Sequence, residues 1–158
     1  MVLQKIETHL NANEISYQIR HHEATPTSED SARVRGESLS SGAKAILYKV
    51  QEEFCLFVIA ADQRIDPRKI KTYFKAQGKR AKKTRFASPE ELLERTGLIP
   101  GSVPPFGHPI LPFTLYVDPT LLSNEKISFN AGSLEHSITM KLEDYMHVSG
   151  AEVFDFCS

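Results

Sequence analysis

Two consecutive apolar segments, AKAILYKV at residues 43–50 and FCLFVIAA at residues 54–61, decide how this chain folds. Both are rich in branched and aromatic residues, which favour β-strands. The polar residues 51–53 between them predict a turn. The second segment is almost continuously apolar, as expected of a strand that is buried on both faces. The sequence therefore predicts a strand–turn–strand unit whose second strand is central in a sheet.

The residues before this unit predict two helices and a strand. Apolar side chains recur at helical spacing over residues 2–12, which indicates an amphipathic helix. Alternation over residues 15–19 indicates a half-buried strand that ends near residue 22. A short helix should follow, capped by Thr27 or Ser28.

The residues after it predict short helices and strands without regular βαβ alternation, which favours an α+β (mixed α/β) fold built as a single domain over residues 1–158. The expected elements are a helix from Asp66 to Lys75, a strand at 81–86, a capped helix from Ser88 to Gly97, a Gly- and Pro-dense loop at 98–109, strands at 113–118, 126–132, 136–140 and 151–156, and a helix from Lys141 to His147.

The composition excludes several classes of protein. Apolar residues make up 41% of the 158 residues and charged residues 25%, so the chain can bury a core of its own. Two cysteines are too few for an extracellular disulfide framework. No apolar stretch approaches the roughly 20 residues that span a bilayer. Met1 is followed by an amphipathic pattern instead of a signal peptide, so we expect a cytoplasmic protein with no membrane partner.

Positive charge is concentrated in one part of a chain whose net charge is only -1. Residues 64–85, here called the basic segment, contain ten of the nineteen Lys and Arg residues and one acid, Asp66. Such a segment suits contact with a phosphate backbone. The alternative is a solvated helix face followed by an edge strand that lysines protect from aggregation.

Familiar catalytic motifs are missing, which narrows the search for a site. The sequence has no GxGxxG, P-loop, HExxH, CxxC or GxSxG motif. The adjacent His21 and His22 would point to opposite faces of a strand and could not easily share a metal. What remains is Lys44, the loop 101–107 and the turn 130–133. The loop could present main-chain N–H groups to an anion or an oxyanion. Taken singly, however, the three features are more typical of a solvated lysine, a rigid connection and a tight turn.

Taken in order along the chain, these pieces resemble the YbaK-like family, also called the prolyl-tRNA synthetase-associated editing domain family. The matching segments are His22-Glu23 with 27–30, 42–47, 60–62 with 64–66, Gly97 with 101–107, 116–118 and 129–133. The resemblance implies a central, mostly antiparallel, barrel-like sheet flanked by helices. It also implies hydrolysis of mischarged aminoacyl-tRNA that carries a small amino acid of the Ala, Cys or Ser class, with no metal, cofactor or covalent intermediate.

The resemblance also assigns roles to individual residues. It makes Lys44 the residue most closely tied to activity, with an electrostatic role near the ester. We expect the substrate to contact His22, Thr27, Gly101, Ser102, Val103, Pro104, Pro105, Phe106, Asn130, Gly132, Ser133 and His136. We expect the tRNA acceptor stem to contact Arg68, Lys71, Lys75, Lys79, Arg80, Lys82 and Lys83. The expected partner is aminoacylated tRNA and not DNA, and recruitment by an aminoacyl-tRNA synthetase is left open.

Two other functions fit the same residues. A module of this fold could bind tRNA or a synthetase without catalysis, although the intact Lys44 and the intact Gly101–Pro105 loop argue against that. A small-molecule hydrolase with no RNA partner is the other alternative, and the salt dependence of activity would separate it from a tRNA enzyme.

Overall fold

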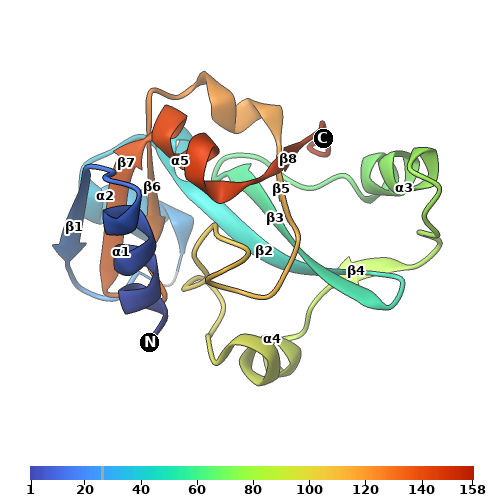
Figure 1. Cartoon of the computed structure of the whole chain (residues 1–158), viewed down its shortest axis with the longest axis horizontal. Coiled ribbons are helices and arrows are strands. Elements are labelled where there is room, and N and C mark those ends of the chain that lie inside the picture. The colour runs from blue at the N-terminus through green and yellow to red at the C-terminus, as the bar shows by residue number, and fades with distance from the viewer. Residues whose placement is uncertain (26) are drawn as a thin grey trace.

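The computed structural model describes residues 1–25 and 27–158, and Figure 1 shows how their elements are arranged. The helices are α1 (Val2–Ala12), α2 (Ser28–Arg35), α3 (Pro67–Ala76), α4 (Pro89–Thr96) and α5 (Leu142–Ser149), with short 3-10 turns η1 (Leu39–Ser41) and η2 (Pro119–Ser123). The strands are β1 (Tyr17–His21), β2 (Ala43–Val50), β3 (Glu53–Ala60), β4 (Thr84–Phe86), β5 (Leu115–Val117), β6 (Lys126–Asn130), β7 (His136–Lys141) and β8 (Glu152–Val153).

The mixed α+β fold predicted from the sequence is confirmed, and its strands divide between two sheets instead of closing one barrel. One sheet has the order β1-β7-β6 and is entirely antiparallel. The other has the order β4-β2-β3-β5-β8, in which β3–β5 and β5–β8 pair in parallel. A parallel bridge between Gly42 and Ser128 links the start of β2 to β6.

The β2–β3 hairpin is the central unit of the larger sheet, as predicted. The strands pair from Ala43 with Ala60 to Val50 with Glu53, so the turn is one residue shorter than expected and consists of Gln51 and Glu52. Gln51 takes a positive φ of 55° in this turn. Alternate residues of β3 enter two separate cores, which explains its continuous apolar character.

The two cores lie on opposite faces of the five-stranded sheet. Leu56 and Val58 face the larger core, which fills the space between the sheets and beneath α1 and α5. Phe57 and Ile59 face a smaller, aromatic core that α3 and the C-terminal residues cover. Figure 1 shows α1, α2 and the three-stranded sheet at one end of the molecule and α3 at the other.

The last predicted strand is much shorter than expected. Only Glu152–Val153 pair as β8, and the chain then turns so that Phe154 and Phe156 enter the smaller core. The Asp118 carboxylate accepts hydrogen bonds from the Phe156 and Cys157 N–H groups at 2.8 Å and 3.0 Å. Hydrogen bonds to the Asp118 side chain therefore take the place of the strand pairing that was predicted for residues 154–156. The strand expected at 81–86 is likewise limited to Thr84–Phe86.

Local capping signals in the sequence are confirmed at three helices. Thr27 caps α2, Asp66 caps α3 with Pro67 at the first helical position, and Ser88 forms a reciprocal capping box with Glu91 on α4. Gly97 ends α4 in the left-handed conformation at φ 75°. In the part of the chain that is described, no helix combines the length and the apolar character needed to cross a bilayer.

Candidate active site

A cleft of about 890 Å³ opens where β2 begins, and we call it the Lys44 cleft. This volume lies within the roughly 300–1,000 Å³ that small-molecule sites usually have. Its walls come from α2, the start of β2, the connection from β3 to α3, and the loop after α4. The residues that line it include Thr25, Thr27, Ser31, Arg35, Gly42, Ala43, Lys44, Ala45, Ile46, Ile59, Asp62, Arg64, Phe86, Pro100, Gly101, Val103 and Asn130.

Lys44 lies on β2 opposite Ile59, and its side chain is exposed within this cleft. Lys44 and Ile46 share one face of the sheet because side chains alternate along a strand. Within residues 1–25 and 27–158, no carboxylate forms an ion pair with the Lys44 ammonium. The cation is therefore available to a ligand in the cleft.

The loop after α4 presents its main chain to the same cleft. Residues 100–103, here called the Gly101 arch, turn at Gly101 with a φ of 87°, which glycine adopts without strain. The Asn130 amide donates to the Gly101 carbonyl at 2.8 Å, and the Gly132 N–H donates to the Ser102 carbonyl at 2.9 Å. These two bonds fix the arch to the end of β6.

The N–H groups of the arch differ in whether they are hydrogen-bonded within the protein. We expected the substrate to contact Gly101 and Ser102, but the Ser102 N–H donates to the Ile99 carbonyl at 3.1 Å and the Ser102 hydroxyl donates there at 2.8 Å. The N–H groups of Gly101 and Val103 have no acceptor among the described residues. A tight turn thus uses the middle amide and leaves its neighbours free.

Asn130 belongs to a polar network that sequence analysis did not find. Its Oδ1 accepts from Arg35 at 3.1 Å, and the Arg35 Nε donates to the Ser137 hydroxyl at 3.0 Å. The His22 ring contacts that hydroxyl at 2.7 Å. Burial lowers the pKa of the Arg35 guanidinium, and Glu37 opposes this shift while Arg20 adds to it. The Arg35 guanidinium therefore lies in the cleft wall and positions the Asn130 side chain.

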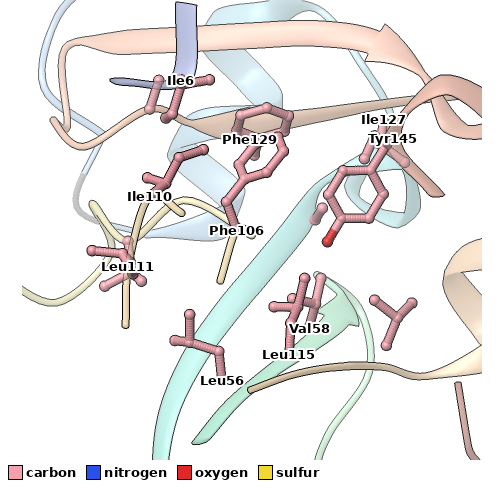
Figure 2. Close-up of a cluster of buried hydrophobic side chains, with 14 of the residues drawn as sticks. Ile6, Leu56, Val58, Phe106, Ile110, Leu111, Leu115, Ile127, Phe129 and Tyr145 are labelled. Carbon is pink, nitrogen blue, oxygen red and sulfur yellow. The ribbon is translucent and has the colours of Figure 1, made fainter. Parts of the chain in front are cut away.

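Three residues of the predicted pocket lie in the core instead of the cleft. We expected the substrate to contact Val103, Pro104, Pro105 and Phe106, but only Val103 lines the cleft, and Pro104, Pro105 and Phe106 are buried away from it. Figure 2 shows Phe106 among the labelled side chains of the larger core, where its ring meets those of Phe129 and Tyr145 edge-on, with centroids 5.5 Å apart in each case. The Tyr145 hydroxyl donates to the Pro105 carbonyl at 2.7 Å. These contacts fix residues 105 and 106, which follow the arch, in the larger core.

Four more predicted residues support the turn between β6 and β7. Gly132, at φ 84°, lies so close to α1 that an added Cβ would come within 2.9 Å of Val2. Ser133 accepts from the Glu135 N–H, and His136 contacts the Ser133 hydroxyl at 3.2 Å. His22 does not line the cleft; its ring contacts the Ser137 hydroxyl, which donates to Asn130 at 3.3 Å. The predicted residues that line the cleft itself are thus Lys44, Thr27, Gly101, Val103 and Asn130.

The basic segment runs from the cleft across α3 to β4. Arg64 lines the cleft, and the seven residues predicted to contact tRNA, Arg68, Lys71, Lys75, Lys79, Arg80, Lys82 and Lys83, are all exposed. Arg68 pairs with Asp66 at 3.4 Å, whereas Lys69 is held by Asp155 and the Cys157 carbonyl. In the described residues, no three His, Cys, Asp or Glu side chains gather as a metal site.

Comparisons with known proteins identify the family to which this chain belongs. The family described as aminoacyl-tRNA editing domain matches residues 22–148. The chain is 34% identical to the Multifunctional Ser/Thr-tRNA deacylase ProXp-y of Escherichia coli (strain K12), over 97% of this chain and 91% of that protein. It is also 29% identical to the uncharacterized protein YwhH of Bacillus subtilis (strain 168), over 99% and 98% of the two chains.

Solved structures share the whole fold. The crystal structure of hypothetical protein APE2540 is 26% identical, with a TM-score of 0.84 over 98% of this chain and 99% of that one. A putative trans-editing enzyme for prolyl tRNA synthetase gives a TM-score of 0.82 over 99% and 97% of the two chains, at 23% identity. The chain belongs to the aminoacyl-tRNA editing domain family. Its activity is that of an aminoacyl-tRNA deacylase.

Proposed function

We propose that this deacylase removes a small amino acid from mischarged tRNA, with Lys44 and the Gly101 arch holding the reacting ester. Within the small amino acids, serine and threonine are the leading substrates, because the Escherichia coli relative is named as a Ser/Thr-tRNA deacylase. Alanine and cysteine complete the class to be compared. One observation carries the proposal: the cleft is lined by Lys44, which forms no ion pair with the described residues, and by Gly101 and Val103, whose N–H groups have no acceptor among those residues.

The proposed reaction is ester hydrolysis. A water oxygen adds to the ester carbonyl, the bond from carbonyl carbon to ribose oxygen breaks, and a proton passes to the ribose oxygen that leaves. The N–H groups of Gly101 and Val103 would donate to the oxyanion formed by this addition. Lys44 would stabilise the same negative charge or the adjacent phosphate as a compact cation. A free hydroxyl of the terminal ribose would help to activate the water.

The shape of the cleft supports selection of small amino acids. Gly42, Ala43 and Ala45 line it beside Lys44, and Val103 stands on the arch. Thr25, Thr27 and Ser31 line the wall formed by α2 and the segment before it, where the Thr25 hydroxyl donates to the Leu134 carbonyl and the Thr27 hydroxyl donates to the Asp30 carboxylate. The oxygens of these hydroxyls can still accept a hydrogen bond from a substrate hydroxyl. Apolar walls distinguish one methylene by only about 1–3 kcal/mol, whereas hydrogen-bonding groups can favour a substrate hydroxyl much more strongly. Hydroxyl groups in the wall therefore favour serine and threonine over alanine.

The basic segment supplies the proposed contact with the acceptor stem. Its exposed cations begin beside the cleft at Arg64 and continue along α3 towards β4, so a stem whose end enters the cleft would pass over them. Removal of one cation that binds a phosphate should reduce the slope of log affinity against log salt by about one. Recruitment by a synthetase would add a second attachment, and the same cations would still bind the RNA.

The test is a deacylation panel of tRNAs charged with serine, threonine, alanine and cysteine, measured at several salt concentrations. We expect the highest kcat/KM for serine or threonine and a steep fall with salt. The double variant Lys71→Glu, Lys75→Glu should raise KM and flatten the salt slope, whereas Lys5→Glu, Lys141→Glu should change neither. If the protein binds these tRNAs but hydrolyses none of them, it is a binding module. If its activity does not depend on salt, the proposed contact between the basic segment and the RNA is wrong.

A further inference from the structure

Phe86 is an exposed aromatic residue in the wall of the Lys44 cleft. It ends β4, its exposed fraction is 57%, and it lines the same cleft as Lys44 and Ile46. Isolated exposed apolar residues are ordinary on protein surfaces. An aromatic ring in the wall of a catalytic cleft is a different case, because its free face is available to whatever occupies that cleft.

The sheet fixes the position of Phe86 relative to Lys44. Phe86 is the register partner of Tyr48 on β2, and directly opposed residues of antiparallel strands share one face. Lys44, Ile46 and Tyr48 also share a face of β2, so the cation and the ring lie on one side of the sheet. Tyr48 lies four positions after Lys44 on β2, so the Tyr48–Phe86 pair is about 13 Å from Lys44 along the strand.

The orientation of the ring is held by its neighbour. The Phe86 and Tyr48 rings meet edge-to-face with centroids 5.2 Å apart and an interplanar angle of 83°. The Tyr48 ring is buried, and its hydroxyl donates to Thr84 on β4. Tyr48 therefore holds one side of Phe86, and the exposed remainder of the ring is left for a ligand.

The charges next to Phe86 indicate what that ligand is. Lys82 and Lys83 precede it and are exposed, and Arg85 beside it is exposed although it pairs with Glu91 at 2.7 Å. An aromatic face next to cations that track a phosphate backbone is the arrangement that binds unpaired nucleotides, because every base has a π-face that can stack. A hydrophobic protein partner would need no such cations.

We infer that Phe86 stacks on an unpaired base at the 3′ end of the tRNA while the ester of the terminal nucleotide lies at Lys44. This inference rests on the proposed function, since it places more of the same substrate in the same cleft. The stacked base fixes how far the 3′ end enters the cleft, and Lys82 and Lys83 neutralise the phosphates next to it. Phe86 thus binds substrate without contacting the reacting carbonyl.

The first measurement uses uncharged tRNA with 2-aminopurine at its terminal or penultimate 3′ position, because stacking quenches the fluorescence of this base. We expect quenching on binding the wild-type protein, retention in Phe86→Tyr, and loss in Phe86→Ala and Phe86→Leu. Phe86→Leu keeps an apolar side chain without a π-face, so it separates stacking from hydrophobic contact. Unchanged quenching in Phe86→Ala, or no quenching by the wild type at either position, would overturn the inference.

The second measurement is deacylation kinetics on the best substrate of the panel. Removal of the base stack should raise KM roughly 5- to 150-fold in Phe86→Ala, with a much smaller change in kcat. The matched control is Leu93→Ala on α4, which removes an apolar residue of 55% exposure outside the cleft and should leave KM unchanged. If the wild type quenches the fluorescence but deacylates none of the tRNAs, Phe86 still binds a base and the proposed function is wrong. If the wild type deacylates and Phe86→Ala leaves the quenching unchanged, the proposed function stands and the role of Phe86 is wrong.

Discussion

Asn130→Ala tests whether the Gly101 arch is held in place for catalysis. The substitution removes the 2.8 Å bond from the Asn130 amide to the Gly101 carbonyl and the acceptor for Arg35 at 3.1 Å. A neutral hydrogen bond contributes about 0.5–1.5 kcal/mol and one to a charged group about 1.5–3 kcal/mol. The free energy of unfolding should therefore fall by about 2–4 kcal/mol.

The same substitution should also reduce catalysis in the molecules that remain folded. Without Asn130, the Gly101 carbonyl loses the partner that sets the direction of the arch, and a shift of about 1 Å in a reacting geometry can cost about 10²-fold in rate. Urea unfolding measures the stability, and kcat for the preferred aminoacyl-tRNA, measured well below the unfolding transition, measures the catalysis.

Asn124→Ala is the matched control for that experiment. Asn124 also uses its amide to bond two carbonyls, those of Ser40 and Leu121 at 3.0 Å and 3.1 Å, but it does not contact the arch. It should lose stability with little change in kcat. If Asn130→Ala is destabilised and yet keeps the wild-type kcat, the arch does not need this attachment and the reasoning is refuted.

Two further predictions concern stability. Burial alone would raise the pKa of Asp118, but hydrogen bonds from Thr120 and from the C-terminal N–H groups outweigh it and lower the pKa. Asp118→Asn should therefore cost about 2–4 kcal/mol at neutral pH. Because the pKa of Asp118 is lower in the folded protein, the extra stability of the wild type is fully present above the unfolded pKa of about 3.9 and is lost as the pH falls through the folded pKa. Urea unfolding of both proteins between pH 3 and 7 would show this loss begin, and a stability difference that grows on acidification would contradict it. Gly107→Ala would press a Cβ onto the Phe113 carbonyl oxygen and should cost about 3 kcal/mol or more, whereas Gly78→Ala meets nothing within 4 Å and should cost about 1 kcal/mol, as thermal unfolding of the pair would test.

The parts of the fold that depend on local sequence could be predicted. The β2–β3 hairpin and the caps at Thr27, Asp66 and Ser88 follow from periodicity and from side chains that bond within three residues. The residues that determine the hairpin and the caps are therefore close together in the sequence. The sequence also singled out Lys44 and the loop 101–107, through an ordered set of motifs whose members are individually weak, and the structure places Lys44, Gly101 and Val103 in one cleft.

The parts that depend on distant contacts could not be predicted. Arg35 reads as an ordinary basic residue in the last turn of a helix, and its role arises from bonds to residues 95 and 102 positions away. Phe106 lies in a loop that has no hydrophobic period, so nothing local shows that its ring packs on Phe129 and Tyr145. The division of the strands into two sheets depends on the same long-range packing.

The most direct measurement is deacylation of the preferred aminoacyl-tRNA by Lys44→Ala, compared with the wild type at equal concentrations of folded protein. Because Lys44 is exposed in the cleft and forms no ion pair with the described residues, its removal should leave the unfolding temperature nearly unchanged. Loss of one electrostatic group that stabilises an oxyanion should lower kcat/KM by about 10²–10³-fold or more. A folded Lys44→Ala protein with wild-type kcat/KM would contradict the central role given to this ammonium.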